Sequence, residues 1–295
     1  MTSLALVSFL WGFSFVVIKG SLGDLDSNFV SFVRLLLSFA VFAPLIRVAR
    51  VPRRDRFRFV FIGAVQFGFM YVSYLAAYRS LPAHAIALLT TTTPLFVSIF
   101  SDCYARAFHR VFLLAALLAV AGGAVLEYPD QPLAASLHGI ALVQLSNAAF
   151  AFGQIAYKQL MVANPGVTDA NVFGLLYGGA VVVTGSLSLF TTDYARLIVR
   201  PGQWGSLAYL GLVASGLGFF LWNAGGRKVN EGALAAMNNL KIPVGVVASL
   251  LILHEKADGG RLLAGCACLA AALWLNERFR GGFRGRPVDG LRRGS

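Results

Sequence analysis

The stretch Trp11-Gly-Phe-Ser-Phe-Val-Val-Ile-Lys19 occurs a second time, in altered form, as Phe150-Ala-Phe-Gly-Gln-Ile-Ala-Tyr-Lys158. Both copies alternate aromatic and small residues, and both end on a lysine. Matched positions are roughly 140 to 150 residues apart, which indicates two copies of one structural unit. Further pairs at this spacing are Thr93-Pro-Leu-Phe-Val-Ser98 with Ile242-Pro-Val-Gly-Val-Val247, and residues 123–127 with 272–277.

The composition is typical of a multi-pass membrane protein. Of the 295 residues, 57% are hydrophobic and 13% are charged, whereas soluble domains carry about 25% charged residues. The charges fall in short intervals between apolar runs, and each run is close to the ~20 residues that cross a ~30 Å hydrocarbon core. Ten runs are expected, at residues 3–21, 29–50, 57–80, 83–105, 109–127, 136–161, 169–190, 203–226, 231–254 and 260–279.

Five runs in each copy determine how the copies are related. Because five is odd, the second copy enters the membrane from the opposite face, which makes an inverted repeat. The predicted fold is an all-α membrane protein with ten transmembrane helices, in two inverted five-helix repeats around a central cavity. We assign the first repeat to residues 1–127, an inter-repeat loop to 128–135, the second repeat to 136–280 and a disordered basic tail to 281–295.

The basic residues predict the orientation of the chain. The formal net charge is +12, but the lysines and arginines cluster beside the apolar runs, as membrane topology requires, which argues against a nucleic-acid partner. If the N-terminus is cytoplasmic, most of the 25 basic residues lie on the cytoplasmic side, as the positive-inside rule predicts. Ten crossings then place both termini in the cytoplasm.

Several stretches are typical of one known family when they are taken in order. They are Trp11–Phe15, Phe32-Val-Arg-Leu35, Tyr78–Ala83, Ala87–Pro94, and Ile242-Pro243 through Leu253-His-Glu255. With them the chain resembles the drug/metabolite transporter superfamily in its ten-helix EamA-type branch, and within that branch bacterial exporters of aromatic amino acids. The resemblance implies a permease of the bacterial inner (plasma) membrane. The halves differ at Glu255, twelve residues after Pro243, because Arg106 stands twelve residues after Pro94.

Polar and aromatic residues form stripes at helical spacing within the runs. Inside hydrocarbon a polar side chain is costly, so it faces a partner helix or a wet cavity. We expect the rings to bind a flat apolar group and the amides and hydroxyls to bind charged groups, although helix packing also uses such residues. The candidate substrate-binding residues are Trp11, Phe15, Tyr74, Tyr78, Thr90, Gln154, Tyr157, Trp222, Asn238 and Lys241; Tyr71, Asn147, Phe150, Ser215 and Phe219 lie in the same stripes.

Two basic residues and two prolines lie within the runs. Arg34 stands about one turn from the start of its run and could snorkel to the membrane surface, whereas Lys241 is more central. Either could hold a substrate carboxylate or could be neutralised by a structural partner. Pro94 and Pro243 each remove a backbone hydrogen bond, so we expect hinges there, with a simple packing kink as the alternative.

The sequence lacks the residue patterns of enzymes and cofactor sites. The four histidines fall near the ends of runs, without metal-ligand spacing or a nucleophile partner. The glycine pairs have no nucleotide-binding context. An intramembrane enzyme would need paired aspartates or a serine with a histidine inside the bilayer. We therefore expect no enzyme activity, no metal and no cofactor.

The leading hypothesis is a secondary transporter of amino acids, aromatic and other neutral ones, that works by alternating access. Because the acidic residues fall at the ends of the runs, we expect no obligatory ion coupling. The alternative is a proton-coupled exporter of other small metabolites or drugs, and a channel or receptor fits the inverted repeat poorly. A cationic drug would need an intramembrane carboxylate. The expected partners are the amino acid and the lipid bilayer, and we expect a monomer.

Overall fold

The computed structural model describes residues 2–104, 133–229 and 231–254, together with parts of the segment 259–278. Four sequence predictions lie mainly or entirely outside the described residues. They are the fifth run at 109–127, the inter-repeat loop at 128–135, most of the tenth run at 260–279, and the tail at 281–295.

The helices in the described residues coincide with the predicted runs. Seven of them are long and apolar enough to cross a membrane, and α12 (Glu231–Ile252) lies at the ninth run. The chain is thus an all-α membrane protein with at least seven candidate spans. These seven are Thr2–Leu22, Ser27–Leu45, Arg53–Ala77, Ala83–Tyr104, Leu137–Ala163, Asp169–Thr191 and Pro201–Gly226.

Three of the spans are interrupted by a different helix type. The third span and the seventh, which ends at Gly226, each contain a π-helix, and the fourth contains a 3-10 turn. The single helices are α1 (Thr2–Leu22), α8 (Leu133–Ala163) and α9 (Asp169–Thr191), with α2 (Ser27–Phe42) followed by short 3-10 turns. The composite spans are α3 (Arg53–Gly63), η3 (Ala64–Phe69) and α4 (Met70–Ala77); α5 (Ala83–Leu89), η4 (Thr90–Thr92) and α6 (Thr93–Tyr104); and α10 (Pro201–Ala208), η5 (Tyr209–Leu217) and α11 (Gly218–Gly226).

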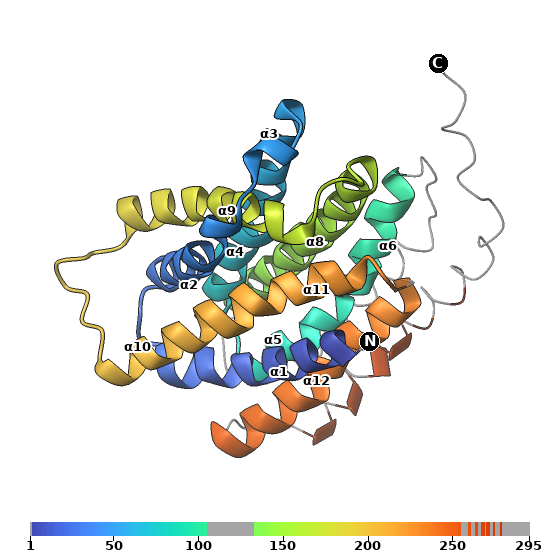
Figure 1. Cartoon of the computed structure of the whole chain (residues 1–295). Coiled ribbons are helices and arrows are strands. Elements are labelled where there is room, and N and C mark those ends of the chain that lie inside the picture. The colour runs from blue at the N-terminus through green and yellow to red at the C-terminus, as the bar shows by residue number, and fades with distance from the viewer. Residues whose placement is uncertain are drawn as a thin grey trace.

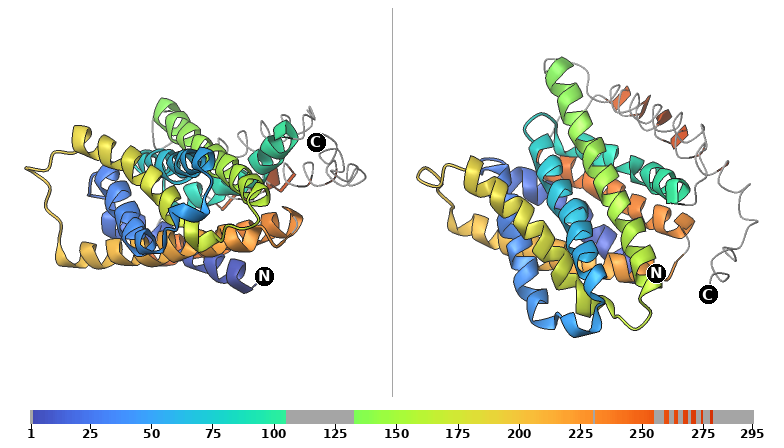
Figure 2. Two further views of the ribbon diagram at one scale, coloured as in Figure 1. Left: turned by 45° about the horizontal axis from the view of Figure 1, so that its top comes forward. Right: turned by 90° about the horizontal axis from the view of Figure 1, so that it is seen from above.

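The helices form two layers. In one layer α2, α9, the α3–α4 span and α8 lie side by side in that order, and in the other α12, α1 and the α10–α11 span are neighbours (Figure 1). The view from above shows the first layer covering much of the second (Figure 2). Segments far apart in the sequence therefore pack directly on one another, and the polar stripes of both halves can meet between the layers.

The helix contacts occur in matched pairs between the two halves. Helix α1 packs on α12 as α8 packs on α6, α2 packs on η5 as α9 packs on η3, and α1 packs on α11 as α8 packs on α4. The two π-helices, η3 and η5, lie in the third and eighth runs. Exchanging the first four runs for the sixth to ninth therefore maps each of these contacts onto another.

Two ion pairs also occupy matching places in the two halves. Arg79, just after α4, pairs with Asp26 at the start of α2, with 3.1 Å between Nη2 and Oδ2. Arg227, just after α11, pairs with Asp169 at the start of α9, with 3.2 Å between the same atoms. Each pair joins the beginning of one span to the end of the next span in its half.

Glycines allow α9 to lie directly against the backbone of the third span. Gly63 packs on the backbone of Leu176, and Gly179 packs on the carbonyl group of Val60. A Cβ atom on Gly179 would lie 2.8 Å from the carbonyl carbon of Val60 and would overlap its oxygen. Small residues serve this purpose in membrane helices, where close van der Waals packing replaces the hydrophobic driving force.

Candidate functional site

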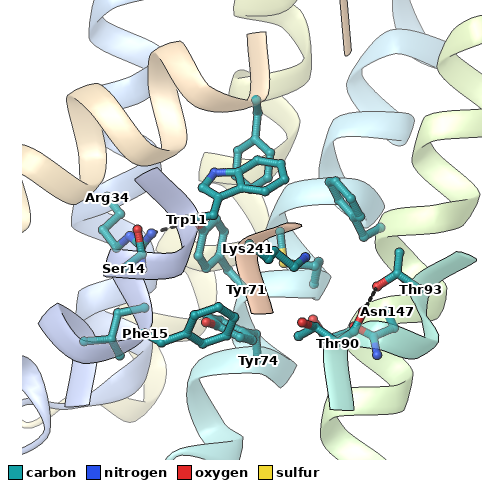
Figure 3. A pocket seen from close by; sticks show the side chains of 15 residues that line it. Trp11, Ser14, Phe15, Arg34, Tyr71, Tyr74, Thr90, Thr93, Asn147 and Lys241 are labelled. Carbon is teal, nitrogen blue, oxygen red and sulfur yellow. Dashed lines mark hydrogen bonds between the residues drawn. The ribbon is translucent and has the colours of Figure 1, made fainter. Parts of the chain in front are cut away.

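A cavity of about 80 Å³ lies where the polar stripes of the two halves meet. Sites for drug-sized ligands are usually ~300–1,000 Å³, so a ligand of that size requires the surrounding helices to move apart. Figure 3 shows the cavity with its lining side chains. They are Trp11, Ser14, Phe15, Ile18, Arg34, Met70, Tyr71, Tyr74, Thr90, Thr93, Ser146, Asn147, Phe150, Phe219 and Lys241.

Trp11 is the centre of an aromatic wall. Its ring centroid lies 5.9 Å from that of Phe150, 5.0 Å from that of Phe219 and 4.9 Å from that of Trp222. The indole Nε1 donates a 2.8 Å hydrogen bond to the carbonyl oxygen of Ala214. The wall therefore joins side chains of α1, α8 and α11 and offers a flat apolar surface to a ligand.

Arg34 enters the cavity from α2 and is 1% exposed. Its Nη2 donates hydrogen bonds to the hydroxyl of Tyr71 at 2.7 Å and to the hydroxyl of Ser215 at 3.1 Å. Its guanidinium carbon lies 4.4 Å from the centroid of the Tyr71 ring. Among the described residues, Nε and Nη1 have no hydrogen-bond partner. Arg34 is thus a buried guanidinium with N–H donors that are available to a ligand.

Lys241 enters the cavity from α12 and is 7% exposed. Its ammonium donates a 3.0 Å hydrogen bond to Oδ1 of Asn238 and lies 5.5 Å from the centroid of the Trp11 ring. No acidic residue is among the described residues that line the cavity. The cavity therefore holds two buried basic side chains, Arg34 and Lys241, and none of its described lining residues is a carboxylate.

Hydroxyl and amide groups face the cavity on the Lys241 side. Thr90 donates its hydroxyl hydrogen to the carbonyl of Ala87, and Thr93 donates to the carbonyl of Thr90. Asn147 donates through Nδ2 to the carbonyl of Leu89 and to the hydroxyl of Thr92. These hydrogens are engaged with the protein, so the oxygens of Thr90, Thr93 and Asn147 remain as acceptors.

The π-helix η5 holds several lining residues in place. Its carbonyls accept hydrogen bonds from Ser38 at Gly211, from Trp11 at Ala214, and from Tyr177 at Ser215 and Gly216. A π-turn leaves backbone carbonyls out of the regular α-helical pattern, and in a membrane such groups need partners from within the protein. The side chains of neighbouring helices supply them, which ties Trp11 and Arg34 to η5.

The structure brings together half of the residues chosen from the sequence. Trp11, Phe15, Tyr74, Thr90 and Lys241 line the cavity. The other five candidates are not in the lining. Three of them contact a lining residue: Tyr78 shares a hydrogen bond with Tyr74, Trp222 packs on Trp11, and Asn238 accepts a hydrogen bond from Lys241. Gln154 is buried elsewhere on α8, and Tyr157 donates a hydrogen bond to Asp169.

Several lining residues are not among the ten candidates predicted from the sequence. Four of them occur in the same stripes as the predicted candidates: Tyr71, Asn147, Phe150 and Phe219. Helical spacing places them on the buried face but does not show which residues of that face line a cavity. For Arg34 the sequence leaves two positions open, a contact with substrate or the membrane surface, and the structure places it, buried, in the cavity wall. The contacts between helices, which the sequence does not give, determine which residues of a stripe line the cavity.

The two prolines occupy different local settings. Pro94 lies at the start of α6, directly after the 3-10 turn Thr90–Thr92. Proline cannot donate to the carbonyl four residues earlier, and the hydroxyl of Thr93 donates to that carbonyl, on Thr90, at 2.8 Å. Pro243 lies inside α12, which runs without interruption from Glu231 to Ile252.

Comparison with known proteins identifies relatives along the whole chain. The sequence pattern of the EamA-like transporter family matches residues 1–127 and, a second time, residues 137–277. A probable biotin transporter of Pseudomonas aeruginosa is 40% identical, over 95% of this chain and 98% of the relative. The biotin transporter of Escherichia coli (strain K12) is 33% identical, over 99% of this chain and 98% of the relative.

A relative with a different printed substrate is less similar. A probable amino-acid metabolite efflux pump of Salmonella typhimurium is 28% identical, over 92% of each chain. The motif resemblance to amino acid exporters therefore identified the right superfamily, but the more similar relatives are biotin transporters. One solved crystal structure aligns with a TM-score of 0.65 at 15% identity, over 94% of this chain and 98% of that one, and so shares the fold.

Proposed function

We propose that this chain, which belongs to the EamA-like transporter family, is a secondary transporter whose substrate is biotin. The relatives that are 40% and 33% identical carry that substrate in their names. The proposal for this chain also rests on its own cavity, in which charge, hydrogen-bonding groups and apolar surface correspond to the parts of biotin.

The observation that carries the proposal is the unbalanced charge of the cavity. Arg34 and Lys241 are both buried, and no acidic residue is among the described lining residues. A buried charge is costly unless it is paired. A substrate with a carboxylate would supply the missing negative charge, and biotin is a monoanion at neutral pH because its only strongly acidic group is a carboxyl.

The remaining chemistry of biotin also has counterparts in the cavity. Its fused rings are apolar and compact, which suits the wall formed by Trp11, Phe150 and Phe219. Its ureido group presents two N–H donors and one carbonyl oxygen. The oxygens of Thr90, Thr93 and Asn147 are available acceptors for those donors.

A neutral amino acid, aromatic ones included, is the second candidate substrate. The 28% identical relative is named as an amino-acid metabolite efflux pump, and the aromatic wall would accept an aromatic side chain. However, the ammonium of an amino acid favours a carboxylate partner, and the described lining offers two basic side chains instead. The cavity therefore favours an anion over a zwitterion.

Alternating access between two inverted repeats is the proposed transport mechanism. The matched helix contacts and the matched ion pairs Arg79–Asp26 and Arg227–Asp169 support the repeat. We retain residues 1–127 and 136–280 as the repeats, with both termini in the cytoplasm, the bacterial inner membrane as the location and a monomer as the working unit. The small cavity is consistent with a conformation in which the repeats have closed around the site.

Substrate uptake decides between the two candidates. Purified protein in liposomes is expected to take up radiolabelled biotin, and excess unlabelled biotin should compete. Phenylalanine and leucine should compete weakly or not at all, because a zwitterion leaves its ammonium without a lining carboxylate. Uptake of phenylalanine with no uptake of biotin would contradict the biotin proposal and favour the amino acid.

We further propose that transport needs no coupled ion, because the described lining contains no acidic residue, the residue type that most often carries the proton in coupled transporters. Uncoupled movement of a monoanion transfers charge. A membrane potential of 100 mV, positive inside, should then raise the equilibrium accumulation of biotin about 50-fold, since it adds ~2.3 kcal/mol per charge. A potassium gradient with valinomycin sets the potential, and a proton ionophore serves as the control. Uptake that requires a proton gradient would refute the uncoupled mechanism.

A further inference from the structure

We propose that the cavity binds its substrate at two separate cationic positions, with Arg34 as the carboxylate-binding residue and Lys241 as the donor to the ureido carbonyl. This inference rests on the proposed function and adds the orientation of the substrate to it. It follows from the partners that each cation already has, and from the groups that surround each of them.

Arg34 lacks partners for part of its guanidinium. Nη2 is engaged by Tyr71 and Ser215, but Nε and Nη1 have no hydrogen-bond partner among the described residues, although the side chain is 1% exposed. Arginine remains protonated under all ordinary conditions. A buried, permanently charged group with free donors calls for an anionic acceptor, and a planar carboxylate matches a guanidinium in geometry as well as charge.

Lys241 has different surroundings. Its ammonium already binds Oδ1 of Asn238 and lies over the Trp11 ring. Thr90, Thr93 and Asn147 lie on this side of the cavity (Figure 3), and their free oxygens are acceptors. An ammonium donor beside several acceptors complements a ureido group, which has one carbonyl oxygen and two N–H groups.

The two cations are not one composite site. Figure 3 shows Arg34 on one side of the Tyr71 ring and Lys241 on the other. Biotin likewise separates its carboxylate from its ureido group by a four-carbon chain and the fused rings. The aromatic side chains between the two cations, Trp11 and Tyr71, are placed to contact this apolar middle part of the molecule.

Tyr71 and Ser215 are positioning residues for Arg34. The Tyr71 hydroxyl lies 2.7 Å from Nη2 and 2.9 Å from the Ser215 hydroxyl, which closes a triangle of hydrogen bonds. Tyr71 comes from α4 in the first half, and Ser215 comes from η5 in the second. The orientation of the carboxylate-binding group thus depends on both halves of the transporter.

Paired ligands test the assignment. Isothermal titration calorimetry on the full chain in detergent would measure biotin and biotinamide, which lacks the negative charge but keeps the ureido group. The wild type should bind biotin about 10- to 100-fold more tightly than biotinamide, the range for hydrogen bonds to a charged group. Arg34→Met should lose this preference by weakening biotin alone. Lys241→Met, the matched control, should weaken both ligands by a similar factor and keep the preference.

Two milder variants keep the test decisive if Arg34→Met does not fold. Arg34→Lys retains the charge and should restore part of the preference for biotin. Tyr71→Phe should weaken biotin several-fold and leave biotinamide unchanged, whereas a merely structural role would weaken both. The assignment is overturned if Arg34→Met keeps the preference for biotin, if Lys241→Met abolishes it, or if the wild type shows no preference.

The same titrations separate this inference from the biotin proposal. If the wild type binds neither biotin nor biotinamide, the proposed substrate is wrong, and phenylpropionate with phenylpropionamide becomes the ligand pair. A preference for the acid that Arg34→Met removes would then support Arg34 as the carboxylate-binding residue without biotin. Equal affinity for acid and amide, or no binding of either, would overturn the assignment.

Discussion

Replacing Gly179 with alanine is expected to prevent the chain from folding into a stable, monodisperse protein. The new Cβ would overlap the carbonyl oxygen of Val60 and lie 3.0 Å from the nitrogen of Ala64. Overpacking in a core typically costs ~1–3 kcal/mol. The obstacle here is backbone rather than a flexible side chain, so we expect the cost to reach or exceed the upper end of that range.

The neighbouring residue provides a matched control. A Cβ on Gly178 would meet only the Phe39 ring, at 3.5 Å, which is ordinary van der Waals contact. Alanine also favours a helix over glycine by ~1 kcal/mol, so Gly178→Ala should be as stable as the wild type or more stable. Size-exclusion profiles and melting temperatures in detergent would compare the two variants. Equal stability of both would show that α9 and the third span are not packed as closely as described.

Replacing Trp11 with alanine is expected to reduce transport more than about 100-fold. The change removes the ring that contacts Phe150, Phe219 and Trp222, together with the hydrogen bond to Ala214. Truncation of a buried aromatic residue typically costs ~3–5 kcal/mol. Because Trp11 also forms part of the cavity lining, substrate contacts are lost as well as packing. Initial uptake rates per amount of protein, together with the folded fraction from size-exclusion profiles, would measure the combined effect.

A pair of phenylalanine variants separates the ring from its hydrogen bond. Trp11→Phe keeps an aromatic ring but leaves the carbonyl of Ala214, in η5, without its donor, so uptake should fall by about tenfold. Trp222→Phe removes an indole N–H that has no partner among the described residues, and its effect should be smaller. A larger loss in Trp222→Phe than in Trp11→Phe would argue against the role assigned to the Ala214 contact.

The site shows why only part of it could be predicted. Helical spacing selected Trp11, Phe15, Tyr74, Thr90 and Lys241, which line the cavity, and also Tyr157, which binds Asp169 instead. All of them lie in polar or aromatic stripes, and a stripe says only that a face is buried against something. Whether that face meets a cavity or another helix depends on its neighbours in space.

Hydrophobic run length was sufficient to predict the seven candidate spans of the described residues. A helix needs about twenty apolar residues to cross the membrane and must satisfy its backbone hydrogen bonds within itself. The tandem motifs were likewise enough to indicate two copies of one unit. Both properties are local. The orientation of Arg34 was decided by the tertiary structure, since its partners Tyr71 and Ser215 are 37 and 181 residues away. The π-helix η5 depends on the tertiary structure for the same reason. Side chains of Trp11, Ser38 and Tyr177 donate hydrogen bonds to its backbone carbonyls, and only the packing of the helices brings these side chains to η5.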